Sequence, residues 1–426
     1  MHLNLIKSSI IIFFTVLLIP ITCFYFRNNG QILQSYPPFH KKIPRNYQKV
    51  TTYLGSDFDI PKKSAPIKGM YARAYCLYDP DTNRVIYGRN ETEKLPMAST
   101  TKIMTCIIAL EEGKQTDKIR FSGYAASMPD VQLNAKKGDT FYLKDLLYSL
   151  MLESHNDTAV AIAEHIGGSV EGFAEKMNKK ARLLNCKHTH FVTPNGLDDK
   201  KHYTTAADLC KIAGYAIKNK DFLKIIGTQS YSFQELKKKQ SYQIHSHNLF
   251  LTSYPGAIGI KTGYTGNAGY CFCGAAKRNG MTLISSVLAS GFPPHKTYKW
   301  SDTRKLMDYG FQNYKQIKIS PVPVPRLLSI FHSSKDDISL QCKTSEKLQF
   351  TLSARDTVTH KTELPSRLKA PIRKGDIVGY EKYYQNGTLL YQFPILAGES
   401  ADVRDKSYYR SMLQRLFLFA VPKNPD

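Results

Sequence analysis

The sequence predicts an α/β fold of the α+β kind, in which a domain of helices around a sheet precedes a small all-β domain. The first observation is a series of Gly-punctuated alternating segments over residues 257–288, typical of strands, after helical periodicity over 143–166 and 170–184. The second is a change of texture at a Pro-rich segment, residues 320–325. Short alternating segments follow it, with a strong hairpin signal in the Asn-Gly pair at 386–387. This order of elements is neither a repeat nor a parallel βαβ series.

The amino-terminal segment predicts export. Lys7 precedes a run of apolar residues that ends near Arg27, which is the pattern of a signal peptide or an N-terminal membrane anchor over residues 1–30. No clear cleavage site distinguishes these two alternatives. Residues 31–69 are rich in Pro, Lys, Tyr and Ser without a sustained period, and they predict a linker.

The mixed domain is expected over residues 70–318. It begins with a hairpin over 71–89, followed by a helix that carries Ser99. Residues 143–166 predict two helices that break at the Glu-Ser-His-Asn segment, 153–156.

The small β domain is expected over residues 319–405, and a tail over 406–426 follows it. The tail places apolar side chains on one helical face, so it predicts either an interfacial membrane helix or a helix packed on the β domain. The eight cysteines do not have the spacing of a dense disulfide framework, and most are expected as buried thiols. Cys271 and Cys273 alternate along one predicted strand and therefore face the same side.

A net charge of +24 favours an anionic partner. No nucleic-acid-binding motif accompanies this charge, and the leader points outside the cytoplasm. The charge therefore indicates an anionic membrane surface or wall polymer as the partner, and no nucleic acid.

The first motif with chemical meaning is Ser-Thr-Thr-Lys, from Ser99 to Lys102. Hydroxyl residues before an apolar helical run are ordinary helix-start signals. The same spacing also brings Lys102 one turn above Ser99, where a neutral lysine can activate a serine nucleophile. The segment Ser366 to Lys369 repeats the spacing, but prolines flank it and it reads as a loop.

Two further motifs follow in order, Ser154-His155-Asn156 and Lys261-Thr262-Gly263. In acyl transfer, Ser154 would relay a proton to the leaving nitrogen and Asn156 would hold a substrate amide. Lys261 and Thr262 would bind a carboxylate, with Lys261 also lowering the pKa of Lys102, and Gly263 would let substrate backbone approach the strand closely. Ser-His-Asn also occurs at 246–248, so the ordered trio is the specific signal.

The trio resembles the penicillin-recognising serine acyl transferases. The segments LPMASTTKIMT, FVTPNGLDDKKHYTTAADL and GAIGIKTGYTGNAGYC narrow the resemblance to the serine-type D-Ala-D-Ala carboxypeptidases, the low-molecular-mass penicillin-binding proteins. The resemblance implies a helix-flanked antiparallel sheet with a helical subdomain, which is the β-lactamase/transpeptidase-like fold. It also implies an exported, membrane-held enzyme that removes the terminal D-alanine from peptidoglycan stem peptides through a serine ester. β-Lactams would inhibit this enzyme, and neither a cofactor nor a metal is expected.

Carried over residue by residue, the resemblance makes Ser99 the nucleophile and Lys102 the base. Ser154, Asn156 and Lys261 complete the proton and binding network.

Backbone N–H groups of Ser99 and Tyr264 would form the oxyanion hole, and Asn248 of the second Ser-His-Asn is expected to be structural. Lys299 stands where many relatives carry an arginine that binds the substrate carboxylate, with Arg304 nearby as a second candidate.

The middle motif carries His155 where glycine is frequent in the family, and its side chain is expected to narrow or charge the rim of the cleft.

Three alternatives stay open. A D,D-endopeptidase would cut crosslinks with the same site. A class A β-lactamase would also need a deacylating glutamate segment, which the sequence does not supply. A non-enzymatic wall-binding protein would not need the intact catalytic side chains.

Overall fold

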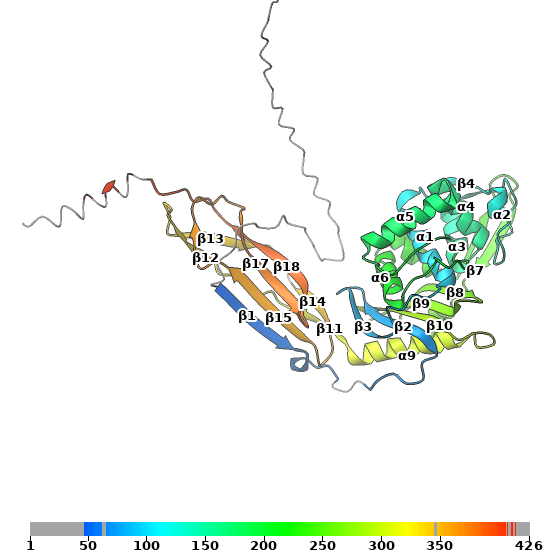
Figure 1. Ribbon diagram of the computed structural model, residues 1–426, viewed down its shortest axis with the longest axis horizontal. Helices are drawn as coiled ribbons and strands as arrows, with labels where there is room; N and C mark the ends of the chain where they lie inside the picture. The colour runs from blue at the N-terminus through cyan, green and yellow to red at the C-terminus, as the bar shows by residue number, and fades with distance from the viewer. Residues whose placement is uncertain are drawn as a thin grey trace, which may run out of the picture. The chain divides into compact units, whose positions relative to one another are not determined.

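The computed structural model describes residues 47–61, 65–344 and 347–405, together with residues 407, 410, 411 and 414. The predicted leader and nearly all of the predicted tail lie outside the described residues. The described part contains a five-stranded sheet with helices and a seven-stranded sheet with a separate strand pair (Figure 1). No helix of this part combines the length and the apolar character needed to cross a membrane.

The five-stranded sheet is antiparallel throughout, in the order β3-β2-β10-β9-β8. Its strands are β2 (Ala72–Asp79), β3 (Arg84–Arg89), β8 (Ala257–Thr265), β9 (Gly269–Arg278) and β10 (Met281–Ser290). Alternate residues enter two different cores, as the pleat requires. Cys271 and Cys273 pack into the larger core, whereas Phe272 between them packs into the core under α9 (Tyr298–Asn313). The expectation that both cysteines face the same side is confirmed.

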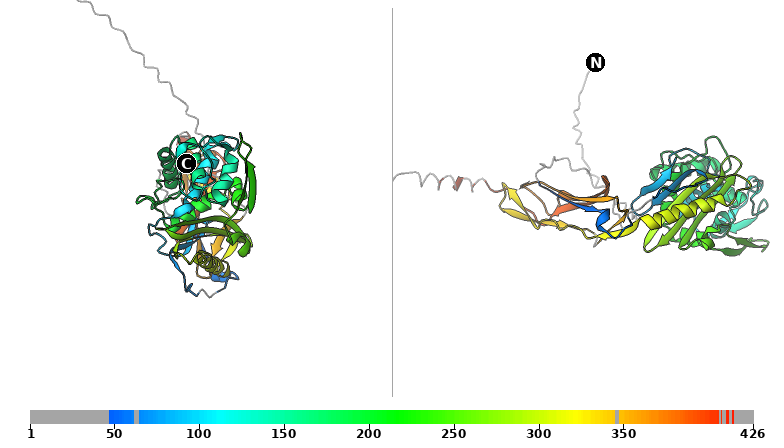
Figure 2. Two further views of the ribbon diagram at one scale, coloured as in Figure 1. Left: turned by 90° about the vertical axis from the view of Figure 1, so that its right-hand side faces the viewer. Right: turned by 90° about the horizontal axis from the view of Figure 1, so that it is seen from below.

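Helix α9 covers one face of this sheet (Figure 2). The helices α1 and α6 pack on the opposite face (Figure 1). The helices before α9 are α1 (Lys102–Glu112), α2 (Gly123–Ala126), α3 (Leu143–Leu152), α4 (Asn156–Gly167), α5 (Val170–Leu183), α6 (Ala206–Ala216), α7 (Lys220–Ile226) and α8 (Phe250–Ser253), with the 3₁₀ turns η1 (Gly55–Asp57) and η2 (Ala98–Thr101). Two short strand pairs accompany them, β4 (Lys118–Arg120) with β5 (Thr140–Tyr142) and β6 (Ser230–Gln234) with β7 (Ser241–His245).

The predicted hairpin over 71–89, the helix break at 153–156 and the strands over 257–288 are confirmed. One difference concerns Ser99, which lies in the 3₁₀ turn η2 rather than in the helix that follows. The chain enters this turn through Ala98 at φ 47°, a left-handed conformation that the regular helix cannot continue.

The second sheet has the order β1-β15-β17-β18-β13-β12-β16, and β11 pairs with β14 beside it. The strands are β1 (Tyr47–Leu54), β11 (Lys315–Ile319), β12 (Leu327–Phe331), β13 (Asp337–Cys342), β14 (Leu348–Leu352), β15 (Thr357–Leu364), β16 (Leu368–Lys369), β17 (Ile377–Gln385) and β18 (Thr388–Ala397). Two clusters of buried apolar side chains stabilise this all-β region.

The prediction of a linker over 31–69 is wrong for β1, which pairs with β15 along its full length. Val50 of this edge strand is 51% exposed, so the strand has no continuous buried face. Backbone hydrogen bonds to β15 replace the apolar periodicity that would have identified the strand from its sequence.

Seven cysteines fall within the described residues, and all of them are free thiols. Six are buried and Cys342 is half-buried, which confirms the expectation of buried thiols. Cys23 of the leader lies outside the described residues.

Candidate active site

Ser99 and Lys102 meet at the junction of η2 and α1. The Lys102 Nζ lies 2.9 Å from Ser99 Oγ, 2.8 Å from Asn156 Oδ1 and 2.7 Å from the main-chain oxygen of Asn195. The Lys102 side chain is fully buried, whereas Ser99 is half-buried. The structure therefore brings the first motif and the asparagine of the second motif together, as the sequence predicts.

The surroundings of Lys102 favour its neutral form. Burial lowers its pKa well below the ordinary value, the charge of Lys261 lowers it further, and Asp157 opposes both. Lys261 is itself buried, and burial lowers its pKa to about 7. Its Nζ donates to the main-chain oxygen of Thr262 at 3.1 Å, so within the described contacts it acts on Lys102 through charge.

Two glycines let the walls of the site close around the nucleophile turn. A Cβ added to Gly263 on β8 would lie 3.0 Å from the Ser99 nitrogen, and one added to Gly196 would lie 2.0 Å from the Ala98 oxygen. The sequence predicts that Gly263 makes room for substrate backbone. That role stays a prediction, and the structure adds a second reason for a glycine here, since the nucleophile turn brings the Ser99 amide against β8 at this position.

The second motif lies at the break between α3 and α4. Asn156 Nδ2 donates to the main-chain oxygens of Pro129 and Asp130, each at 3.1 Å, and this fixes Oδ1 toward Lys102. Ser154 has φ 71°, and its buried hydroxyl oxygen has no hydrogen-bond partner among the described residues.

His155 does not lie at the rim of the cleft, so that expectation is wrong. It is only 3% exposed, with Nδ1 2.8 Å from Ser149 Oγ and Nε2 3.1 Å from Glu153 Oε2. The N-cap residue of a helix after a break can direct its side chain back to the preceding helix, and a tripeptide does not reveal this direction.

The residues predicted to bind carboxylate are not all brought together. Thr262 is half-buried on β8, and Tyr264 is 45% exposed, with its ring 4.7 Å from that of Tyr270. Lys299 Nζ lies 4.6 Å from the Tyr270 ring centre and donates to the Lys296 oxygen, and burial lowers its pKa to about 8.

Arg304 donates instead to the main-chain oxygen of Ser253, which precedes β8. The structure thus places Lys299 near the end of β8 that carries Thr262, and it does not place Arg304 there.

Sequence reasoning missed the loop over 191–203. Its Asn195 carbonyl accepts from Lys102, and His202 Nε2 lies 2.8 Å from Thr101 Oγ1. A main-chain oxygen has no residue signature, so motif spacing could not identify it. The available signal was the segment 191–209 itself, one of those that carry the family resemblance.

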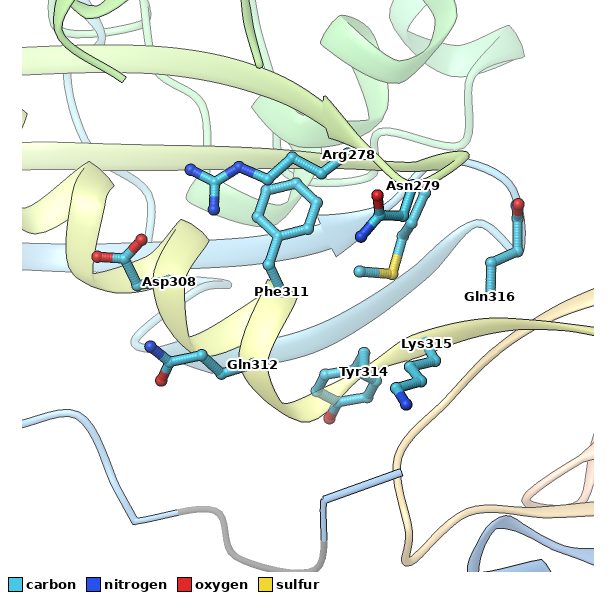
Figure 3. Close-up of a pocket in the computed structure, with 9 residues that line it drawn as sticks. Arg278, Asn279, Asp308, Phe311, Gln312, Tyr314, Lys315 and Gln316 are labelled. Carbon is cyan, nitrogen blue, oxygen red and sulfur yellow. The ribbon is translucent and has the colours of Figure 1, made fainter. Parts of the chain in front are cut away.

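Two hollows of the surface differ in their relation to this site. A cleft of about 1180 Å³ is lined by Asp198 and His202, which bond to Thr265 on β8 and to Thr101 beside the nucleophile. The second hollow, of about 410 Å³, lies between the β9–β10 turn and the end of α9 (Figure 3). Its lining includes Arg278, which lies over the Phe311 ring, and none of the predicted site residues. We therefore assign no substrate to the second hollow.

No group of three or more His, Cys, Asp and Glu side chains in the described part of the chain could hold a metal ion.

Comparison with known proteins gives a consistent result. Residues 61–291 match the family model described as D-alanyl-D-alanine carboxypeptidase, and residues 322–402 match that of the penicillin-binding protein 5 C-terminal domain. The D-alanyl-D-alanine carboxypeptidase DacF of Bacillus subtilis is 32% identical over 77% of this chain and 85% of that protein. Penicillin-binding protein 5 from Haemophilus influenzae is 26% identical with a TM-score of 0.66, over 79% of this chain and 99% of that structure. A Streptomyces DD-transpeptidase is 32% identical with a TM-score of 0.55, over 58% of this chain and 99% of that structure.

Proposed function

Because the chain belongs to the D-alanyl-D-alanine carboxypeptidase family, we propose that it removes the terminal D-alanine of peptidoglycan stem pentapeptides through an acyl-enzyme on Ser99. Membership makes the chain a serine-type carboxypeptidase of the cell wall. The observation that carries the mechanism is the 2.9 Å contact between Lys102 Nζ and Ser99 Oγ.

The partners of Lys102 support its role as the base. Asn156 Oδ1 and the Asn195 carbonyl can only accept hydrogen bonds, so a neutral Lys102 donates both of its N–H bonds to them. Its lone pair then remains for the Ser99 hydroxyl. As Ser99 attacks the carbonyl of the penultimate D-alanine, Lys102 accepts the hydroxyl proton.

The oxyanion of the tetrahedral intermediate would accept from the backbone N–H groups of Ser99 and Tyr264. Support for this comes from the close approach of the Ser99 nitrogen to Gly263, the residue before Tyr264 on β8. Preorganised N–H donors of this kind stabilise the charge that develops in the transition state.

Collapse of the intermediate breaks the C–N bond, and the departing nitrogen takes a proton from the Ser154 hydroxyl. Ser154 regains this proton from Lys102, so the net transfer runs from Ser99 to the leaving amine. Water then attacks the ester with Lys102 again as the base, and the shortened peptide leaves. Thr262 and Lys261 would bind the terminal carboxylate, with Lys299 contributing less from its position over Tyr270.

The proposal is tested by the intact mass of the protein after incubation with a fluorescent penicillin. Wild type is expected to gain one adduct that a peptide map locates on Ser99, and Ser99→Ala is expected to gain none while remaining folded. An adduct that persists in Ser99→Ala, or that maps to Ser366, would overturn the assignment.

We also propose that the enzyme is exported and held at an anionic membrane surface. The support is the apolar leader, the amphipathic pattern after residue 406 and the net charge of +24. Deletion of residues 1–30 and 406–426 together should release active protein from vesicles that contain anionic lipid. Retention of the double truncation on vesicles at high salt would contradict this proposal.

A further inference from the structure

Ser154 is held in a conformation that it does not itself stabilise. Its φ of 71° lies in the left-handed region, which costs a non-glycine residue about 1–2 kcal/mol. Its buried hydroxyl oxygen has no hydrogen-bond partner among the described residues. Neighbouring groups must therefore maintain this backbone, as they do where strain is kept at functional sites.

The next residue, His155, provides such support through its side chain. Its own φ of −59° is ordinary, so its backbone makes no special demand. The buried imidazole bridges Ser149 Oγ on α3, at 2.8 Å, and Glu153 Oε2, at 3.1 Å. Glu153 and Ser149 both precede Ser154 in the chain, so the ring connects the two sides of the strained residue.

The hydrogen-bond chemistry assigns one tautomer to this ring. The Glu153 carboxylate can only accept, so Nε2 carries the proton and Nδ1 accepts from the Ser149 hydroxyl. Ser149 Oγ is then available to accept from Thr158 Oγ1, 2.9 Å away on α4. Burial lowers the pKa of His155, while Asp157 and Glu153 oppose the shift, so the lowered pKa favours the neutral imidazole.

The bridge is anchored at its far end as well. Glu153 Oε1 accepts from the backbone N–H of His245, the last residue of β7, at 2.8 Å. The main-chain oxygen of Leu152 accepts from His247 at 3.3 Å. The turn that carries Ser154 is thus fixed between α3, α4 and the segment after β7.

We propose that His155 is a positioning residue whose bridge between Ser149 and Glu153 holds Ser154 where its hydroxyl can protonate the departing amine. This inference rests on the proposed function, since it assigns a role in the same acylation step. In that step the Ser99 O–C bond forms and the C–N bond breaks. The electron pair goes to nitrogen, and the proton passes from Ser99 through Lys102 and Ser154 to that nitrogen.

A comparison of substrates with different leaving groups distinguishes a positioning role of His155 from a purely structural role. An amide nitrogen must be protonated as it departs, whereas a thiolate leaves a thioester without a proton. Loss of Ser154 positioning should therefore slow a peptide that ends in D-Ala-D-Ala and spare the thioester with the same acyl group. General acid catalysis contributes on the order of 10²–10⁴-fold, so partial mispositioning should cost roughly tenfold or more in kcat.

The experiment measures kcat and KM for both substrates in wild type, His155→Gly and Ser154→Ala. The matched control is His188→Gly, because His188 is exposed in a turn and its backbone N–H contacts Asp208, away from the turn that carries Ser154. We expect His155→Gly and Ser154→Ala to lower kcat for the amide with KM nearly unchanged, and to leave the thioester within about twofold. The double variant Ser154→Ala/His155→Gly should lose little more than Ser154→Ala, and His188→Gly should lose nothing on either substrate.

Equal losses on amide and thioester, or no loss on either, would overturn the proposal. If His155→Gly does not fold, Ser149→Ala removes one end of the bridge and should also slow the amide more than the thioester, by a smaller factor. A Ser149→Ala variant without this difference between the two substrates would equally contradict the proposal. Failure of the proposed function would be distinguishable, because wild type would then turn over neither substrate and Ser99 would not be acylated.

Discussion

The chain contains two Ser-His-Asn tripeptides that have different surroundings in the structure. In the first, Asn156 Oδ1 contacts the buried Lys102 and His155 is buried. In the second, Asn248 Oδ1 accepts from the backbone N–H of Phe250 at 3.2 Å, which forms a local turn before α8, and His247 is exposed. The asparagine of the same tripeptide therefore contacts a candidate base in one place and its own backbone in the other.

The two segments are also neighbours in space, since the His247 N–H donates to the Leu152 oxygen. Their difference follows from what comes next in the chain. Asn156 begins α4, a helix of 12 residues whose first turn packs beside α1, whereas α8 has only 4 residues. A tripeptide thus acquires its function from the element that orients it, and each prediction below tests one part of this contrast.

The largest expected effect comes from Lys102, which contacts only the first segment. Lys102→Met should lower the rate of penicillin acylation on the order of 10²–10⁴-fold, because it removes the base. The wild-type acylation rate should rise with pH as Lys102 loses its proton. This rise should occur well below pH 10.5, because burial and Lys261 lower the pKa of Lys102. Stopped-flow acylation across pH measures both. Lys369→Met is the control, because Lys369 ends the second Ser-x-x-Lys segment, which the sequence predicts as a loop but which in the structure ends in β16. A comparable loss there would contradict the assignment.

The next effect compares the two asparagines directly. Asn156→Ala should lower kcat/KM for the D-Ala-D-Ala peptide roughly ten- to a hundredfold, because Lys102 becomes charged when it accepts the Ser99 proton and a hydrogen bond to a charged group contributes about 1.5–3 kcal/mol. Asn248→Ala should leave kcat/KM within about twofold. Steady-state hydrolysis of the same peptide decides the matter, and equal losses would show that the second tripeptide also serves the site.

A smaller effect concerns the terminal carboxylate of the substrate, which neither tripeptide is proposed to bind and which Thr262 on β8 would bind instead. Thr262→Val should reduce hydrolysis of the free peptide roughly ten- to a hundredfold, and Lys299→Ala only a few-fold, because its ammonium already contacts the Lys296 oxygen and the Tyr270 ring. The measurement is kcat/KM with the free peptide and with its C-terminal amide. If wild type cuts the amidated peptide equally fast, the free carboxylate is not recognised and the result favours the endopeptidase alternative.

The sequence predicted the meeting of Ser99, Lys102 and Asn156 because helical spacing and motif order constrain side chains at the starts of two helices. It could not predict the Asn195 carbonyl, since any residue type can supply a main-chain oxygen. It gave His155 the wrong surroundings, because the direction of a side chain at a helix break depends on partners such as Ser149 and Glu153.

The elements of the fold likewise separate into those that the sequence predicts and those that it does not. Alternation and helical periodicity located β8 to β10 and the pair α3 and α4, where most side chains are buried. They failed for β1, whose partner β15 is distant in sequence and whose Val50 is largely exposed. Sequence prediction and structure thus differ most where backbone pairing, rather than side-chain burial, stabilises an element.

The smallest expected effect concerns stability and isolates the second tripeptide. The Asn248 side chain accepts the Phe250 N–H, and loss of such a local turn bond costs about 0.5–2 kcal/mol. Asn248 Nδ2 is buried without a partner among the described residues, so truncation also removes an unsatisfied donor and offsets part of that cost. Asn248→Ala should therefore lower the free energy of unfolding by about 1 kcal/mol or less, with no change in penicillin acylation. Urea denaturation with wild type in parallel measures the first quantity and labelling of Ser99 the second. A variant that unfolds normally but acylates slowly would mean that the second segment reaches the site, and the contrast between the two tripeptides would not hold.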